Sequence, residues 1–195
     1  MTASIEIARR MAASVHARLG KESVIALADV LICKKFKKGE RVLDEGEVCE
    51  NILFIEKGMT RQFYYKYNKD LTEHIGYENG MVMCLESYFS EQPTHLMIET
   101  LEATTAWMLN KKKIMALSEH NFEIATFYRR IFEMSLIESQ VKADTLRFEP
   151  ANVRYAKLLS LHPEILKRAP LIYIASFLQM TPETLSRVRS ASLND

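Results

Sequence analysis

The stretch Leu171–Ser190, LIYIASFLQMTPETLSRVRS, constrains the fold more than any other part of the chain. Apolar residues at helical spacing predict a short first helix, and the pair Gln179-Met180 then breaks it before a second helix begins. Thr181 followed by Pro182 predicts the start of that second helix, because the Thr side chain can accept a backbone N–H and Pro at the first helical position loses no needed hydrogen bond. Two short helices joined by a tight turn predict a helix-turn-helix.

The second predicted helix has one apolar and one polar face. Leu185 and Val188 lie three residues apart and are expected to face inward. The residues on the opposite, outward face are Glu183, Ser186, Arg187 and Ser190. An ordinary helical hairpin that closes a small domain is the alternative, but the helix start together with the outward Glu, Ser and Arg favours DNA binding.

The run IASFLQMTPETLSRVR resembles the DNA-reading element of the cyclic-AMP receptor protein/Fnr (Crp/Fnr) family of bacterial transcription regulators. Ala175 occupies the small position where the helices cross, and residues 183–187 match the recognition-helix pattern in which Glu, Ser and Arg face base edges. Gln179 stands where many such turns have Gly, which would strain it at positive φ. The resemblance implies a palindromic double-stranded DNA site as partner. We expect DNA contacts from Thr181, Glu183, Thr184, Ser186, Arg187, Arg189 and Ser190.

The region before the long helix predicts an antiparallel β-structure. Five of the six glycines fall between Phe36 and Gly80, and β-branched or aromatic runs lie between them, which is typical of a barrel or sandwich. The predicted strands are 41–43, 51–55, 59–67, 71–77, 96–101 and 104–109, with a short helical excursion before the last two. The order KKGERVLDEGEVCENILFIEKGMTRQFYY resembles the opening of the cyclic-nucleotide-binding β-roll of the same family.

Three further helical regions are predicted outside the strands. Residues 5–19 and 23–32 have helical periodicity, and a long helix is expected from about 121 to 147. The long helix is apolar on two faces and must therefore cover two surfaces. One stripe consists of Phe127, Ile131, Met134 and Val141, and the other of Phe132, Leu136, Ala143 and Leu146. The resemblance favours the first stripe as a dimer seam and the second as cover for the β-roll; the alternative is that both pack within one chain.

The expected fold class is α+β: an N-terminal double-stranded β-helix (jelly-roll, cyclic-nucleotide-binding-like) barrel, a dimerisation helix and a C-terminal helix-turn-helix. The predicted domains are the β-roll at 1–118, the dimerisation helix at 119–148 and the winged-helix-like DNA-binding domain at 149–195. Family members usually add a β-hairpin wing after the recognition helix. Only five residues follow Ser190, so we expect no wing in this sequence.

The candidate effector pocket departs from the family pattern. Ligand-binding members hold a cyclic nucleotide through a Gly-Glu segment at the ribose and an Arg-Ser pair at the phosphate. Here no Gly precedes Glu86, Thr94-His95 falls at the Arg-Ser position, and no Arg occurs between Arg61 and Arg129. A buried phosphate would lack its counter-charge, so we expect no cyclic AMP binding. The candidate pocket residues are Glu86, Thr94 and His95, and the effector is unknown or absent.

Composition and spacing exclude several other classes. The chain carries 26 Lys and Arg against 25 Asp and Glu, but six against three from residue 151 onward, which fits a local DNA contact. Cys33, Cys49 and Cys84 are odd in number and far apart, so no disulfide framework or N-terminal iron–sulfur site is implied. No membrane span or signal peptide is evident, which predicts a cytoplasmic protein. No metal-ligand or nucleophile–base spacing occurs, so we expect no metal, no cofactor and no enzymatic activity.

The leading hypothesis is a homodimeric transcription regulator that binds DNA, with RNA polymerase as a candidate partner and no contact with membranes. The alternative from another class is a small-molecule-binding β-roll protein whose DNA-binding tail is degenerate. A barrel enzyme with a bound metal is the weakest of the three hypotheses, because no tight ligand spacing supports it.

Overall fold

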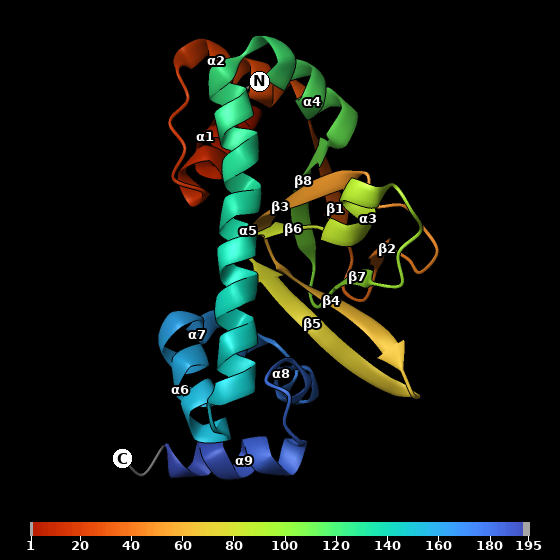
Figure 1. Ribbon diagram of the computed structural model, residues 1–195, viewed down its shortest axis with the longest axis vertical. Coiled ribbons are helices and arrows are strands. Elements are labelled where there is room, and N and C mark those ends of the chain that lie inside the picture. The colour runs from red at the N-terminus through yellow and green to blue at the C-terminus, as the bar shows by residue number, and fades with distance from the viewer. Residues whose placement is uncertain (1, 193–195) are drawn as a thin grey trace.

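The computed structural model describes residues 2–192, which form an elongated molecule built along one long helix (Figure 1). The helices are α1 (Thr2–Ser14), α2 (Lys21–Val30), α3 (Leu85–Ser90), α4 (Lys111–His120), α5 (Phe122–Phe148), α6 (Ala151–Leu161), α7 (Pro163–Arg168), α8 (Leu171–Phe177) and α9 (Pro182–Ala191). The strands are β1 (Leu31–Phe36), β2 (Arg41–Leu43), β3 (Asn51–Lys57), β4 (Met59–Lys66), β5 (Lys69–Tyr77), β6 (Met81–Val82), β7 (Met97–Thr100) and β8 (Thr104–Asn110). The β-strands lie beside α5, with β4 and β5 reaching down to the level of α8, and α6 to α9 gather at the lower end of α5 (Figure 1).

The strands form a β-roll of two four-stranded sheets, in the orders β1-β8-β3-β6 and β2-β7-β4-β5. All pairings among them are antiparallel. Gly58, between β3 and β4, has φ +112°, and an added Cβ would lie 2.7 Å from the Thr104 Cα, so only glycine fits this turn. The buried core between the sheets continues into α1, α2 and the first part of α5. The predicted α+β class with a jelly-roll barrel is confirmed.

Strand β1 is the main secondary-structure element that the sequence pattern missed. The helix predicted over 23–32 ends at Val30, and Leu31–Phe36 instead pairs with β8 along its whole length. Only Leu31 in this strand is buried, so β1 lacks the alternation of buried and exposed residues that marks a strand in sequence. Pairing with the distant strand β8 therefore determined that this segment is a strand and not part of a helix. Helices α4 and α7 were also not predicted, and the domain boundary expected after residue 118 falls inside α4.

The long helix α5 has nearly the expected bounds, but its apolar stripe is divided differently. Phe127 and Ile131 are 0% and 1% exposed, because the β-roll and the N-terminal helices cover them within the same chain. These two residues are therefore not exposed for contact with a second copy, and the dimer seam stays a prediction. Met134 is partly buried against the same core, whereas Val141 is 58% exposed. The physical reason is that the chain's own core covers only the first half of α5, and the second half extends beyond it.

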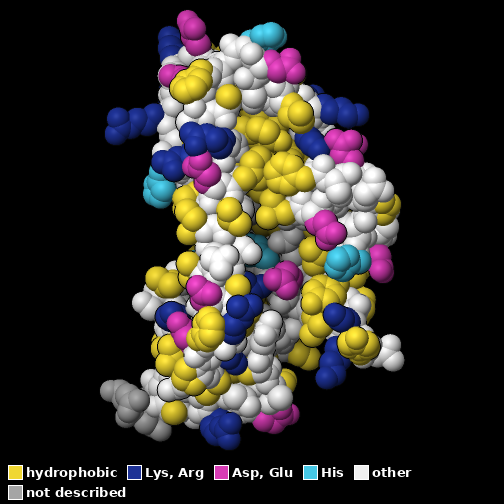
Figure 2. Space-filling view, in the orientation of Figure 1, with side chains coloured by type: hydrophobic (Ala, Val, Ile, Leu, Met, Phe, Trp, Pro, Cys, Tyr) yellow, Lys and Arg dark blue, Asp and Glu magenta, His cyan; other side chains and the backbone are white. Residues whose placement is uncertain are grey.

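The second predicted stripe of α5 covers the β-roll at one end only. Phe132 contacts Phe89 of α3, with ring centroids 4.6 Å apart, and Figure 2 shows apolar side chains gathered in the hollow between α5 and α3. Leu136, in contrast, is 69% exposed. One row of exposed or half-exposed apolar residues along the outer part of α5 consists of Met134, Ile137, Val141 and Phe148.

Helices α6 to α9 enclose a second core that also includes residues of the β-roll. Its buried members are Met59, Ile75, Leu101, Tyr155, Leu158, Ile165, Ala169, Ile174, Ala175, Leu178, Leu185 and Val188. The C-terminal helices thus pack directly against the second sheet instead of hanging from α5 alone. Among residues 2–192 no helix has both the length and the apolar character that crossing a membrane requires.

Candidate nucleic-acid interface

The start of α9 is built as the sequence predicts. Thr181 is the N-cap, and its Oγ1 accepts a hydrogen bond from the Thr184 N–H at 3.2 Å, while Pro182 occupies the first turn. Backbone and Thr181 hydrogen bonds lower the pKa of Glu183, so its carboxylate is favoured at the positive end of the helix. The cap fixes where α9 begins and therefore which side chains face outward.

The turn between α8 and α9 contains the strain expected at Gln179. This residue has φ +50°, in the left-handed region that favours glycine, at a cost of roughly 1–2 kcal/mol. Arg154 of α6 supports the turn, because its Nη2 donates to the Gln179 carbonyl at 3.3 Å and its Nη1 to the Glu149 carbonyl at 2.9 Å. Arg154 thus joins the end of α5 to the helix-turn-helix. Sequence reasoning did not single out this role, and the 25-residue separation from Gln179 leaves no local signal for it.

The two faces of α9 are separated as predicted. Leu185 and Val188 are buried in the C-terminal core. The exposed residues of the opposite face are Glu183, Ser186, Arg187 and Ser190. Within the described part of the chain, no hydrogen bond or ion pair is formed by the Arg187 side chain. The Ser190 hydroxyl donates to the Ser186 carbonyl at 3.0 Å, and its oxygen remains able to accept. Four of the seven predicted DNA-contacting residues therefore share one exposed face.

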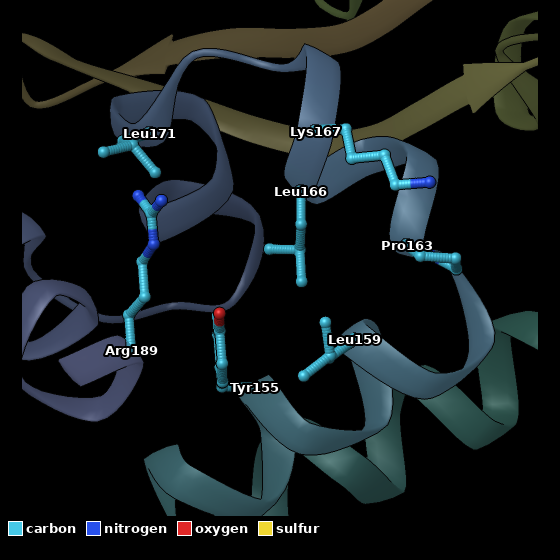
Figure 3. A pocket seen from close by; sticks show the side chains of 7 residues that line it. All are labelled: Tyr155, Leu159, Pro163, Leu166, Lys167, Leu171 and Arg189. Atoms are coloured by element: carbon cyan, nitrogen blue, oxygen red, sulfur yellow. The ribbon is translucent and has the colours of Figure 1, made fainter. Parts of the chain in front are cut away.

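Thr184 and Arg189 lie away from that face. Thr184 is half-buried beside the cap, while Arg189 lines a surface pocket formed by four helices (Figure 3). The residues that line this pocket are Tyr155, Leu159, Pro163, Leu166, Lys167, Leu171 and Arg189. Arg189 lies close to Leu171 at one side of the pocket, and Lys167 lies at the opposite side (Figure 3). Arg189 is thus placed beside the start of α8, away from the residues that form the outward face of α9.

Arg61 of β4 anchors α8 to the outer face of the second sheet. Its side chain is 3% exposed and forms ion pairs with Asp70 and Glu99, each at 2.6 Å. The guanidinium lies between two rings, with its central carbon 3.9 Å from the centroid of Phe63 and 3.6 Å from that of Tyr173. Because Tyr173 belongs to α8, this buried cation holds the first helix of the helix-turn-helix against the β-roll.

Polar contacts on either side of Arg61 complete the attachment. The Thr72 N–H of β5 donates to Ser176 Oγ of α8 at 2.8 Å. Arg168 of α7 pairs with Glu78 and with Glu102 on two turns of the β-roll. Although burial opposes it, Arg168 holds the pKa of Glu78 down to about 2. The helix-turn-helix is therefore fixed in one orientation, with α9 at the end of the molecule farthest from α1 (Figure 1).

The three predicted effector-pocket residues do not gather around a common cavity. Glu86 and His95 are exposed. Thr94 is buried, but its N–H donates to the Glu47 carbonyl at 2.8 Å and its Oγ1 accepts from the Leu96 N–H at 2.9 Å, so loop contacts occupy both groups. Arg61, the buried cation of β4, is directed toward α8.

The inner side of α3 is filled by its own residues. Ser87 Oγ accepts from the Cys49 N–H at 2.9 Å and donates to the Gln92 carbonyl at 2.6 Å. Tyr88 is fully buried, and its hydroxyl lies 3.0 Å from the Tyr128 hydroxyl of α5. Helix α3 is therefore closed onto both the β-roll and α5. Among residues 2–192 no group of three or more His, Cys, Asp or Glu side chains is placed to hold a metal ion.

Comparison with known proteins agrees with this architecture. Residues 33–121 match the family model of the Cyclic nucleotide-binding domain. FixK2 from Bradyrhizobium japonicum is a similar solved structure, with a TM-score of 0.69 at 18% identity over 83% of this chain and 84% of that one. A protein assigned to the Crp/Fnr family of transcriptional regulators, from Eubacterium rectale, has a TM-score of 0.66 at 16% identity over 90% and 85% of the two chains.

The Catabolite Activator Protein of Thermus thermophilus is also similar, with a TM-score of 0.57 at 19% identity over 93% of this chain and 87% of that one. A comparison with curated proteins found no match. The chain as a whole has the fold of the Crp/Fnr regulators, which is the resemblance that the sequence motifs indicated.

Proposed function

We propose that this chain is a cytoplasmic, homodimeric transcription regulator of the Crp/Fnr type that binds a palindromic DNA site through α9. The observation that carries the proposal is the exposed face of α9, on which Glu183, Ser186 and Arg187 stand above a buried Leu185 and Val188. An unpaired Arg can bind guanine O6 and N7 together, and Glu can accept from the cytosine amino group. Arg187 is therefore expected to dominate base recognition.

The proposed dimer forms through the outer half of α5. Met134, Ile137, Val141 and Phe148 are separated by three, four and seven residues, which is the spacing of a coiled-coil seam. In a monomer they would leave a contiguous apolar strip in water. Two copies related by a two-fold axis along this seam would place their α9 helices about one DNA turn, roughly 34 Å, apart. This seam keeps Met134 and Val141 from the sequence prediction. Ile137 and Phe148 take the place of the buried Phe127 and Ile131.

The β-roll is proposed not to bind cyclic AMP. The position of the phosphate-binding Arg-Ser pair is occupied by Thr94 and His95, and the inner side of α3 is filled by Ser87 and Tyr88. A cyclic nucleotide would have to displace these contacts and leave its phosphate without a counter-charge. This arrangement is compatible with an effector of other chemistry and also with the absence of any effector. Contact with RNA polymerase remains a prediction from the resemblance.

Selection of bound sequences from random DNA tests the proposal. The unmodified protein is expected to select a palindrome with G·C pairs in each half. Arg187→Ala should cost about 1–3 kcal/mol per half-site and lose the preference at one base position. The matched control is Lys157→Ala, which is expected to weaken binding to all sequences alike and to flatten the salt dependence. Selection of no common site by the unmodified protein would favour a β-roll protein whose DNA-binding tail is degenerate. An unchanged site with Arg187→Ala would remove α9 from base recognition.

A further inference from the structure

Two cysteine residues lie in contact at the point where α3 leaves the β-roll. Cys84 is the N-cap residue of α3, and Cys49 lies in the loop before β3. Their exposures are 1% and 3%, and neither is in a disulfide. The Cys84 N–H donates to the Cys49 Sγ at 3.3 Å, the Cys49 Sγ lies 3.6 Å from the Asn51 carbonyl oxygen, and the Cys84 Sγ lies 3.8 Å from the Leu96 carbonyl oxygen. The third cysteine, Cys33, is exposed on β1.

The surroundings of the pair favour one thiolate beside one thiol. Hydrogen bonding from Cys84 lowers the pKa of Cys49 to about 7 despite its burial. The same contact and burial raise the pKa of Cys84. Of the two thiols, Cys49 is therefore the one that ionises more readily. A thiolate with a pKa near ambient pH is close to the optimum for nucleophilic attack.

We propose that Cys49 and Cys84 are a redox-active pair that hydrogen peroxide converts into an intramolecular disulfide. The Cys49 thiolate attacks one peroxide oxygen, the O–O bond breaks, and a sulfenic acid and hydroxide form. The Cys84 sulfur then attacks the Cys49 sulfur, the S–O bond breaks, and the departing hydroxyl leaves as water with the Cys84 proton. Two electrons pass from the two sulfurs to the peroxide, which ends as two water molecules once the first hydroxide takes up the proton that Cys49 released.

The position of the pair couples this chemistry to α3. Helix α3 presents Glu86 and Phe89 to solvent, so its local opening would admit a molecule as small as peroxide. A disulfide requires an S–S distance of about 2.05 Å, which replaces the looser contact between the thiols. Because Ser87 binds the Cys49 amide and Tyr88 meets Tyr128 of α5, a shift at the start of α3 changes both attachments. The oxidised form is therefore expected to hold α3 differently against α5.

Treatment of the full chain with hydrogen peroxide tests the proposal by mass spectrometry. Each chain should lose two hydrogen atoms, and peptide mapping without reductant should find a Cys49–Cys84 linkage that dithiothreitol reverses. Cys33→Ser is the matched control and should give the same linkage. Cys84→Ser should stop at a sulfenic acid on Cys49, which dimedone traps, whereas Cys49→Ser should leave Cys84 unoxidised.

The results for the unmodified chain and for Cys33→Ser decide the test, because the buried core is intact in both proteins. Oxidation of Cys33 alone, or linkage between chains through Cys33, would overturn the redox pair. Amide hydrogen exchange in the oxidised protein should be faster in α3 than in the reduced protein. Unchanged exchange there would refute the coupling to α3. These readouts do not involve DNA, so their failure is distinguishable from failure of the proposed function.

Discussion

Helices α3, beside the middle of α5, and α9, at one end of the molecule, are both short but direct their polar groups differently (Figure 1). On α9 the Arg187 guanidinium is exposed and unpaired within residues 2–192, above an apolar inner face. On α3 the hydroxyls of Ser87 and Tyr88 are turned inward and paired with Gln92 and Tyr128. Groups with partners inside the chain have little to offer a ligand, whereas unpaired exposed donors do. The comparison contrasts an open polar face on α9, where we propose DNA binding, with a closed inner side of α3.

The largest effect is expected from changes to the proposed dimer seam, because binding to a palindromic DNA site through α9 requires two copies of the chain. Ile137→Glu combined with Val141→Glu removes apolar burial in both protomers, at roughly 1.5–3 kcal/mol per side chain and thus about 6 kcal/mol or more. Sedimentation should give a dimer for the unmodified protein and a monomer for the double variant, with palindromic DNA affinity lost. Ile25→Glu, at an exposed apolar residue of α2, is the control. A dimer that survives the double change would place the seam elsewhere.

A slightly smaller change in binding free energy is expected at the candidate effector pocket beside α3. Calorimetry with cyclic AMP should detect no binding at micromolar concentration. The missing counter-charge corresponds to a loss of about 3–5 kcal/mol, by analogy with a broken buried ion pair. Thr94→Arg combined with His95→Ser restores the family's residue pair and serves as the comparison. Micromolar affinity in the unmodified protein would show that α3 opens readily and would remove the contrast with α9.

The attachment of the helix-turn-helix to the β-roll is tested at Arg61. Arg61→Ala leaves Asp70 and Glu99 without their buried partner and exposes one face of Tyr173, so unfolding free energy should fall by about 3 kcal/mol. Urea unfolding measures this loss. The neighbouring Arg41, with a side chain 32% exposed and longer contacts to Glu99, is the matched control and should cost less than about 1 kcal/mol when changed to Ala. Equal losses from the two variants would mean that Arg61 does not anchor α8.

The smallest effect is expected at the turn before α9. Gln179→Gly relieves the left-handed strain but gives the unfolded chain more freedom, so a net gain of about 0.5–1 kcal/mol is expected. Thermal unfolding would show the gain as a higher Tm. A lower Tm would mean that the Gln side chain contributes more to the turn than its backbone conformation costs.

Local patterns in the sequence determined the parts of the molecule whose signals lie within a few residues. The Thr181 cap, the buried positions of α9, the turns of the β-roll and the length of α5 all depend on neighbours in the chain, so they could be predicted. The motif around Glu183 to Arg187 also indicated the family fold. For the same reason, four of the predicted DNA-contacting residues share one exposed face.

Only the tertiary structure decided which surfaces remain free. Phe127 and Val141 belong to one stripe in the sequence, but the chain's own core covers the first and leaves the second exposed. Arg61 meets Tyr173, and Cys49 meets Cys84, through contacts between segments distant in sequence. A residue's periodicity reports which face of a helix or strand it occupies. What lies against that face depends on how distant segments pack, and no local pattern contains that information.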